Sequence, residues 1–157
     1  MKFFIEQLAI RPKDKEKAMN LLKALGAYEW ASDRVRAQGK VHQVSGTNTA
    51  ALEFNYELGG TDTDLEFEVL TYDEGSPNWL AEQKGSVVSH FGMHCSCAEL
   101  EEWKARFAEM SIPIVQEVNT KMHTNPAIKD TRRYTYCIFG TRDILGTDLK
   151  FIVRRPL

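Results

Sequence analysis

The chain has 157 residues, of which 43% are hydrophobic and 27% are charged, so it is long enough for one domain with a substantial core. A net charge of −2 excludes the basic surface that nucleic acid or anionic lipid would attract. The opening apolar run is interrupted by Glu6 and is too short for a signal peptide, and no later run approaches the length of a membrane span.

The first half of the chain predicts a strand, a helix and three further strands. The opening segment alternates between apolar and polar residues and is rich in aromatic and branched side chains, which is typical of a strand. From Asp14 to Leu25 the apolar residues recur at helical spacing, and Gly26 is placed to end that helix. The strands are expected near residues 3–10, 30–35, 50–58 and 64–72, the second of them weak.

The second half predicts the same order of elements. Ser96 and Glu99 have the spacing of a capping box, and apolar residues from Leu100 to Met110 follow at helical spacing. Residues 120–131 show little periodicity, so we expect a loop there, at the mouth of a site. The strands of this half are expected near residues 87–95, 113–119, 133–140 and 147–154.

Two modules of βαβββ order therefore form a single domain, one over residues 1–74 and the other over residues 86–157. A short helix at 76–85 is expected to link them, because Ser76 can cap it and Pro77 suits its first position. A lone unit of this kind leaves one face of its sheet exposed, and pairing two units buries or encloses both faces. We predict an α+β fold in which the two modules form a curved mixed sheet or barrel around a cavity.

An internal repeat supports the division into two modules. The segments FIEQLAIRP and VSHFGMHCS open the two halves and align Gln7 with His90. The segments TDLEFEVL and TDLKFIVR close the two halves at nearly the same separation and align Glu66 with Lys150. Identical triplets at matching places in the same element order are hard to obtain by chance.

The order and spacing of these segments resemble the vicinal-oxygen-chelate superfamily, which includes glyoxalase I, methylmalonyl-CoA epimerase, extradiol dioxygenases and antibiotic-resistance proteins. The resemblance covers nearly the whole chain and is carried by the stretches IEQLAIRPKDKEKAMNLLKALGAYEW and FEVLTYDEGSPNWLAEQKGSVVSHFGMHC. It implies a glyoxalase-like fold, a small-molecule substrate or ligand, and a homodimer.

The resemblance also implies a metal site, because members of the superfamily take metal ligands from the first and last strands of each module. Carried over to this chain, those ligands are Gln7, Glu68 and His90. An amide oxygen, a carboxylate and an imidazole suit a divalent ion such as Zn, Ni, Co, Mn or Fe. The fourth position departs from the pattern: where a Glu is expected, the chain offers Lys150 or, by the internal repeat, Ile152.

Two functions are compatible with this set of residues. The retained ligands favour a metal-dependent lyase or isomerase, in which the ion binds vicinal oxygens of a small substrate and stabilises an enolate-like intermediate. Its catalytic base is not identifiable, since Lys150 could serve only if burial lowered its pKa. The missing carboxylate favours a metal-free protein that binds or sequesters a small molecule, with Lys150 paired to Glu66 or Glu68 across the barrel.

Four further residues are candidates for contact with a substrate. His94 lies four residues after His90 on the same strand face, too far along the strand to share one metal ion easily. It can contact substrate or serve as a hydrogen-bonded residue at the rim. The other three candidates, each equally compatible with a surface or core role, are Arg133, Tyr134 and Tyr136.

The cysteines bear on the compartment. Cys95, Cys97 and Cys137 are an odd and sparse set, which favours a reducing, cytoplasmic environment over a disulfide framework. Cys95 and Cys97 lack a second pair that would complete a zinc site, so we interpret them as small packing residues.

Overall fold

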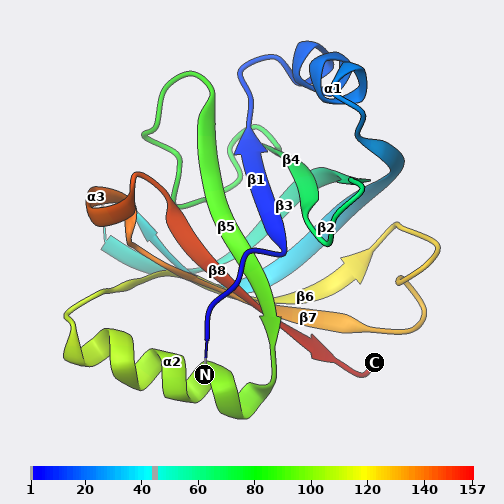
Figure 1. The fold of residues 1–157 in the computed structure, drawn as a ribbon. Coiled ribbons are helices and arrows are strands. Elements are labelled where there is room, and N and C mark those ends of the chain that lie inside the picture. The colour runs from blue at the N-terminus through cyan, green and yellow to red at the C-terminus, as the bar shows by residue number, and fades with distance from the viewer. Residues whose placement is uncertain (1, 44–45) are drawn as a thin grey trace.

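The computed structural model describes residues 2–43 and 46–157 as a closed mixed β-barrel with helices outside it (Figure 1). The strands follow one another around the barrel in the order β1-β4-β3-β2-β6-β7-β8-β5. The first module contains β1 (Gln7–Arg11), α1 (Lys15–Ala24), β2 (Tyr28–Gln43), β3 (Gly46–Gly60) and β4 (Glu66–Tyr72). The second contains β5 (Val87–Cys95), α2 (Cys97–Glu109), β6 (Ile114–His123), β7 (Arg133–Phe139), α3 (Arg142–Leu145) and β8 (Asp148–Arg155).

The predicted α+β fold with two βαβββ modules is confirmed. The first module orders its strands β1-β4-β3-β2 and the second orders them β5-β8-β7-β6, so the two halves share one topology. Both predicted helix caps are present: the Asp14 side chain accepts from the Lys17 amide, and Ser96 and Glu99 form a capping box. Within the described residues, no helix combines the length and the apolarity that crossing a membrane requires.

The predicted helix at 76–85 is wrong, because this segment forms turns. The Asn78 side chain accepts from the Leu80 amide, and the backbone bonds that follow connect residues three apart instead of four. The Arg11 guanidinium donates to the carbonyls of Leu80 and Gln83, which removes two acceptors from a continuing helix. Buried Leu80 then anchors the segment against the barrel.

Two other elements differ from expectation. The weak strand near 30–35 is part of β2, which spans 16 residues and alternates buried and exposed side chains over much of its length. Its exposed positions carry Arg, Gln and Lys. These polar residues interrupt the apolar residues of β2, so the sequence indicates only a short, weak strand. The loop expected at 120–131 begins later, because β6 continues to His123.

The strand register corrects the pairing suggested by the repeated TDL triplet. Gln7 and Ala9 on β1 lie beside Glu66 and Glu68 on β4, and His90 and Gly92 on β5 lie beside Asp148 and Lys150 on β8. With Gln7 equivalent to His90, the counterpart of Ala9 is Gly92. The structural counterpart of Glu68 is therefore Lys150, and neither the Glu66–Lys150 alignment nor Ile152 as the partner of Glu68 is correct.

Apolar side chains occupy both faces of the barrel wall. Inside, the largest cluster includes Leu52, Phe54 and Val118, and outside, Leu100 and Phe107 of α2 pack on the wall. A smaller cluster joins α1 to β4. The barrel is thus closed by strand pairing and sealed on its outer face by two helices.

Gly39 on β2 lies directly opposite Val118 on β6. A Cβ atom there would collide with the Glu117 backbone and lie 2.7 Å from the Val118 Cα, so the strands would have to separate. We expect Gly39→Ala to lower the free energy of unfolding by about 1–3 kcal/mol, measured by urea denaturation. Gly60→Ala is the control, because a Cβ atom at Gly60 would lie 3.7 Å from its nearest neighbour, an ordinary van der Waals distance. Equal stability of the two variants would contradict this account of the barrel.

Candidate functional site

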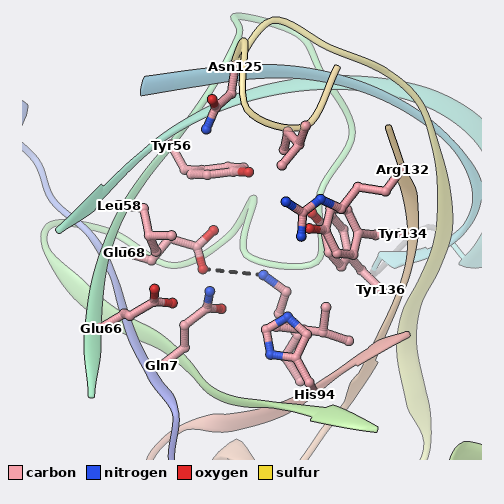
Figure 2. A pocket seen from close by; sticks show the side chains of 13 residues that line it. Gln7, Tyr56, Leu58, Glu66, Glu68, His94, Asn125, Arg132, Tyr134 and Tyr136 are labelled. Atoms are coloured by element: carbon pink, nitrogen blue, oxygen red, sulfur yellow. Dashed lines mark hydrogen bonds and ion pairs between the residues drawn. The ribbon is translucent and has the colours of Figure 1, made fainter. Parts of the chain in front are cut away.

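A cavity of about 290 Å³ lies inside the barrel, beneath the segment that connects β6 to β7 (Figure 2). Figure 2 shows Gln7, Glu66 and Glu68 on one side of the cavity, and Arg132, Tyr134 and Tyr136 on the other. Its polar lining is formed by Gln7, Tyr56, Glu66, Glu68, His94, Asn125, Arg132, Tyr134, Tyr136 and Lys150, and its apolar lining by Leu58, Ile128 and Ile152.

A buried charge cluster forms part of the cavity wall. Glu68 Oε2 lies 3.3 Å from Lys150 Nζ and 3.0 Å from His90 Nε2. The other ring nitrogen of His90, Nδ1, is 2.9 Å from Ser89 Oγ. All three side chains are shielded from water, with exposed fractions of 2% for Glu68, 1% for His90 and 5% for Lys150. Lys150 Nζ also lies 4.4 Å from the centre of the Tyr136 ring, within the range of a cation–π contact.

These contacts set the protonation states of the cluster. Burial alone raises the pKa of Glu68, but the Lys150 ammonium and the His90 hydrogen bond outweigh it and hold this pKa at about 2. Burial lowers the pKa of His90, and the Lys150 ammonium lowers it further, to about 4. At neutral pH Glu68 is therefore a carboxylate and His90 a neutral imidazole.

The residues predicted as metal ligands are brought near one another, but as a donor set they do not fit a divalent ion. The Lys150 ammonium, at the position equivalent to Glu68 in the second module, already neutralises the carboxylate. Both ring nitrogens of His90 are engaged, with Ser89 and Glu68. In the part of the chain that the structure describes, no three His, Cys, Asp or Glu side chains form a group that could hold a metal ion, so Glu68 and His90 have no third ligand of these types.

Gln7 and Glu66 form the acidic and amide side of the cavity. Gln7 Oε1 is buried and has no hydrogen-bond partner among residues 2–43 and 46–157. Glu66 is half-buried, and its pKa is raised by that burial, although the Gln7 side chain opposes the shift. The two side chains come from neighbouring positions on β1 and β4.

The candidate substrate-binding residues fall into two groups. Tyr134 and Tyr136 line the cavity and stack on each other, with ring centres 5.6 Å apart. His94 also lines the cavity, at an exposed edge where its Nδ1 is 3.0 Å from Glu6 Oε2. Arg133 does not line the cavity, because its guanidinium donates to the backbone carbonyls of Lys121, Lys129 and Arg132.

Sequence reasoning missed two important residues, and Arg132 is the first. It lines the cavity in place of its neighbour Arg133. The expected mouth loop would have pointed to it, since Arg132 directly follows residues 120–131, whereas Arg133 begins β7 and has no free guanidinium.

Asp33 is the second missed residue, because β2 was expected to be weak. It is 2% exposed and accepts hydrogen bonds from Tyr56 Oη at 2.7 Å, His123 Nδ1 at 2.6 Å and the amides of Thr124 and Asn125. Burial raises its pKa, but these donors outweigh burial and lower it. The carboxylate thereby ties the mouth segment of the second module to a strand of the first.

Removal of the ammonium tests the buried ion pair. Lys150→Met preserves much of the side-chain volume but leaves the Glu68 carboxylate without its cation. We expect it to lower the free energy of unfolding by about 3–5 kcal/mol in urea denaturation. The double variant Lys150→Met/Glu68→Gln should recover much of the loss, because no uncompensated charge remains. A single variant as stable as the wild type would show that the ion pair does not hold the cluster together.

His90 makes the stability of the barrel depend on pH. Its folded pKa of about 4 lies below the ordinary value of 6.5, so the unfolded chain binds the additional proton first as pH falls. Stability is therefore complete above about pH 6.5 and decreases toward pH 4, by roughly 3 kcal/mol. Urea midpoints measured across this range should show the decrease, and His90→Gln should flatten it. The same slope in both proteins would assign the effect to other groups.

Comparison with known proteins shows the fold alone. The sequence matches no protein-family model and no curated protein. Its structure resembles methylmalonyl-CoA epimerase from Mycobacterium tuberculosis, with a TM-score of 0.55, 12% identity and coverage of 97% of this chain and 88% of that one. It also resembles a hypothetical protein from Bacillus halodurans C-125, with a TM-score of 0.56, 11% identity and coverage of 98% and 96%. The chain therefore shares its fold with these two structures, in agreement with the predicted glyoxalase-like architecture.

Proposed function

We propose that the chain binds a small molecule in the barrel cavity without a divalent metal, and that the Lys150 ammonium supplies the positive charge of the site. The observation that carries this proposal is the ion pair between Lys150 and Glu68, buried beside His90. This ion pair is the arrangement expected for a metal-free binding protein. Lys150 stands at the position where the resemblance implies a carboxylate that binds metal.

The charges of the cluster support this assignment. A divalent ion near Glu68 would lie close to the ammonium, and their repulsion inside a barrel of low dielectric constant would oppose its binding. The ion would also have to displace Glu68 from His90 Nε2 or Ser89 from His90 Nδ1. Each displacement would break a contact between groups that have no access to water.

The ammonium is also suited to hold a ligand. Lys150 lines the cavity, and of its three possible donors one reaches Glu68. A ligand oxygen that enters the cavity can accept from the ammonium, which also polarises a carbonyl as a cation does. The proposal is thus a binding protein whose site can interact with oxygen-bearing groups.

The metal-dependent lyase or isomerase is the second candidate, and the unpaired Gln7 Oε1 favours it. A buried amide oxygen without a donor is available as a metal ligand. This function requires the Lys150 side chain to leave Glu68, so that Gln7, Glu68 and His90 can hold the ion together. A homodimer and a cytoplasmic location stay predictions from the sequence under either function.

Metal analysis separates the two candidates. Protein refed with Zn, Ni, Co, Mn or Fe and then desalted should carry far less than one ion per chain by elemental analysis. Lys150→Glu restores the missing carboxylate and should bind the ion together with Gln7, Glu68 and His90. Without metal this variant places two carboxylates together in the barrel, so added Ni²⁺ should raise its urea midpoint but leave that of the wild type unchanged. Stoichiometric metal in the wild type would favour the enzyme.

A further inference from the structure

We infer that the ligand of the cavity is a small monocarboxylic acid whose carboxylate pairs with Arg132 and whose far end donates a hydrogen bond to the side formed by Gln7 and Glu66. This inference rests on the proposed function, and it specifies the chemical class that the cavity selects. It uses two groups that the fold itself leaves without partners, one on each side of the cavity.

Arg132 is the first of these groups. Its side chain reaches into the cavity from the side opposite Glu66 and Glu68 (Figure 2). Within the described chain, its guanidinium forms no ion pair, and its buried Nε has no hydrogen-bond partner. A guanidinium is always charged and presents a planar fork of donors, so an unused one at a cavity is suited to an oxyanion.

The other basic side chains near Arg132 already have partners. Lys150 neutralises Glu68, and His94 contacts Glu6. Arg133, the neighbouring cation, donates to backbone carbonyls and is turned away from the cavity. Arg132 is thus the lining cation that forms no ion pair among the described residues, and a ligand carboxylate can pair with it.

Gln7 is the second group without a partner. Its Oε1 is buried and accepts no hydrogen bond from the described residues, which is costly for an amide oxygen. Glu66, beside it on β4, adds a carboxylate that forms no ion pair in the part of the chain that the structure describes. Both groups can accept a hydrogen bond, so they select a hydroxyl or amine on the ligand.

The surface between the two ends sets the body of the ligand. Leu58, Ile128 and Ile152 are apolar, and Tyr134 and Tyr136 present stacked rings. A volume of about 290 Å³ is at the small end of ligand sites, which suits a single ring or a short aliphatic chain. A carboxylate fits better than a phosphate dianion, because the second negative charge would lie in the same cavity as Glu66 and Glu68 without a free cation.

The test uses the full ¹⁵N-labelled chain and matched probes. They are para-hydroxyphenylacetate, its methyl ester and phenylacetate, accompanied by neutral and cationic fragments of similar size. NMR titration gives the affinity for each probe and locates the cavity residues that it perturbs. The variants are Arg132→Gln and, as a charge-matched control, Arg106→Gln, whose exposed arginine lies on α2 outside the barrel.

We expect para-hydroxyphenylacetate to bind in the cavity at least about 10-fold more tightly than its ester, which lacks the charge. Phenylacetate should also bind more weakly, because it has no donor for Gln7 or Glu66. Arg132→Gln should weaken binding of the acid by about 10-fold to 100-fold and leave that of the ester unchanged. Arg106→Gln should change neither affinity.

Two results would overturn the inference. The first is equal affinity for acid and ester in the wild type, and the second is an equal loss of both in Arg132→Gln. Binding of only neutral or cationic fragments in the cavity would overturn the carboxylate class and leave the proposed function standing. If no fragment of any charge perturbs the cavity, the proposed function itself fails. If Arg132→Gln does not fold, Arg132→Lys retains the charge without the planar fork, and the ratio of acid to ester affinity should still fall.

Discussion

Glu68 is an almost fully buried carboxylate inside the barrel, and the surrounding structure must compensate its charge. Lys150 provides the compensating cation, and His90 and Ser89 extend the contacts to β5. The three strands that carry these groups come from both modules and are joined by β1, which pairs with β4 on one side and β5 on the other. The ion pair therefore fixes the chemistry of the cavity and links the two halves across it.

The mouth of the cavity depends on a second buried carboxylate. Asp33 accepts three side-chain and two backbone hydrogen bonds, and the backbone donors belong to the segment that carries Arg132. Tyr56 lines the cavity and also donates to Asp33. The Asp33 carboxylate therefore binds both the cavity wall and the segment at its mouth. The position of Arg132 thus follows from a residue on β2 that does not itself line the cavity.

Most of the fold could be predicted from the sequence, whereas the site could be predicted only in part. Periodicity and capping residues identify α1, α2 and β5 closely, because these features are local. The turns at 76–85 could not be foreseen, since they depend on Arg11, a long-range partner of their carbonyls. The equivalence of Glu68 and Lys150 required the strand register, which the repeated triplet misplaces by two residues, and the roles of Arg132 and Asp33 required the loop geometry.

The opposite charges at two equivalent positions have a consequence for how this barrel can be assembled. A barrel made from two copies of the first module would place a carboxylate at both positions, and one made from two copies of the second would place an ammonium at both. Either assembly would bring like charges together in an interior with little water to screen them. The halves share a topology but are no longer interchangeable, so this pair of charges requires one copy of each module in every barrel.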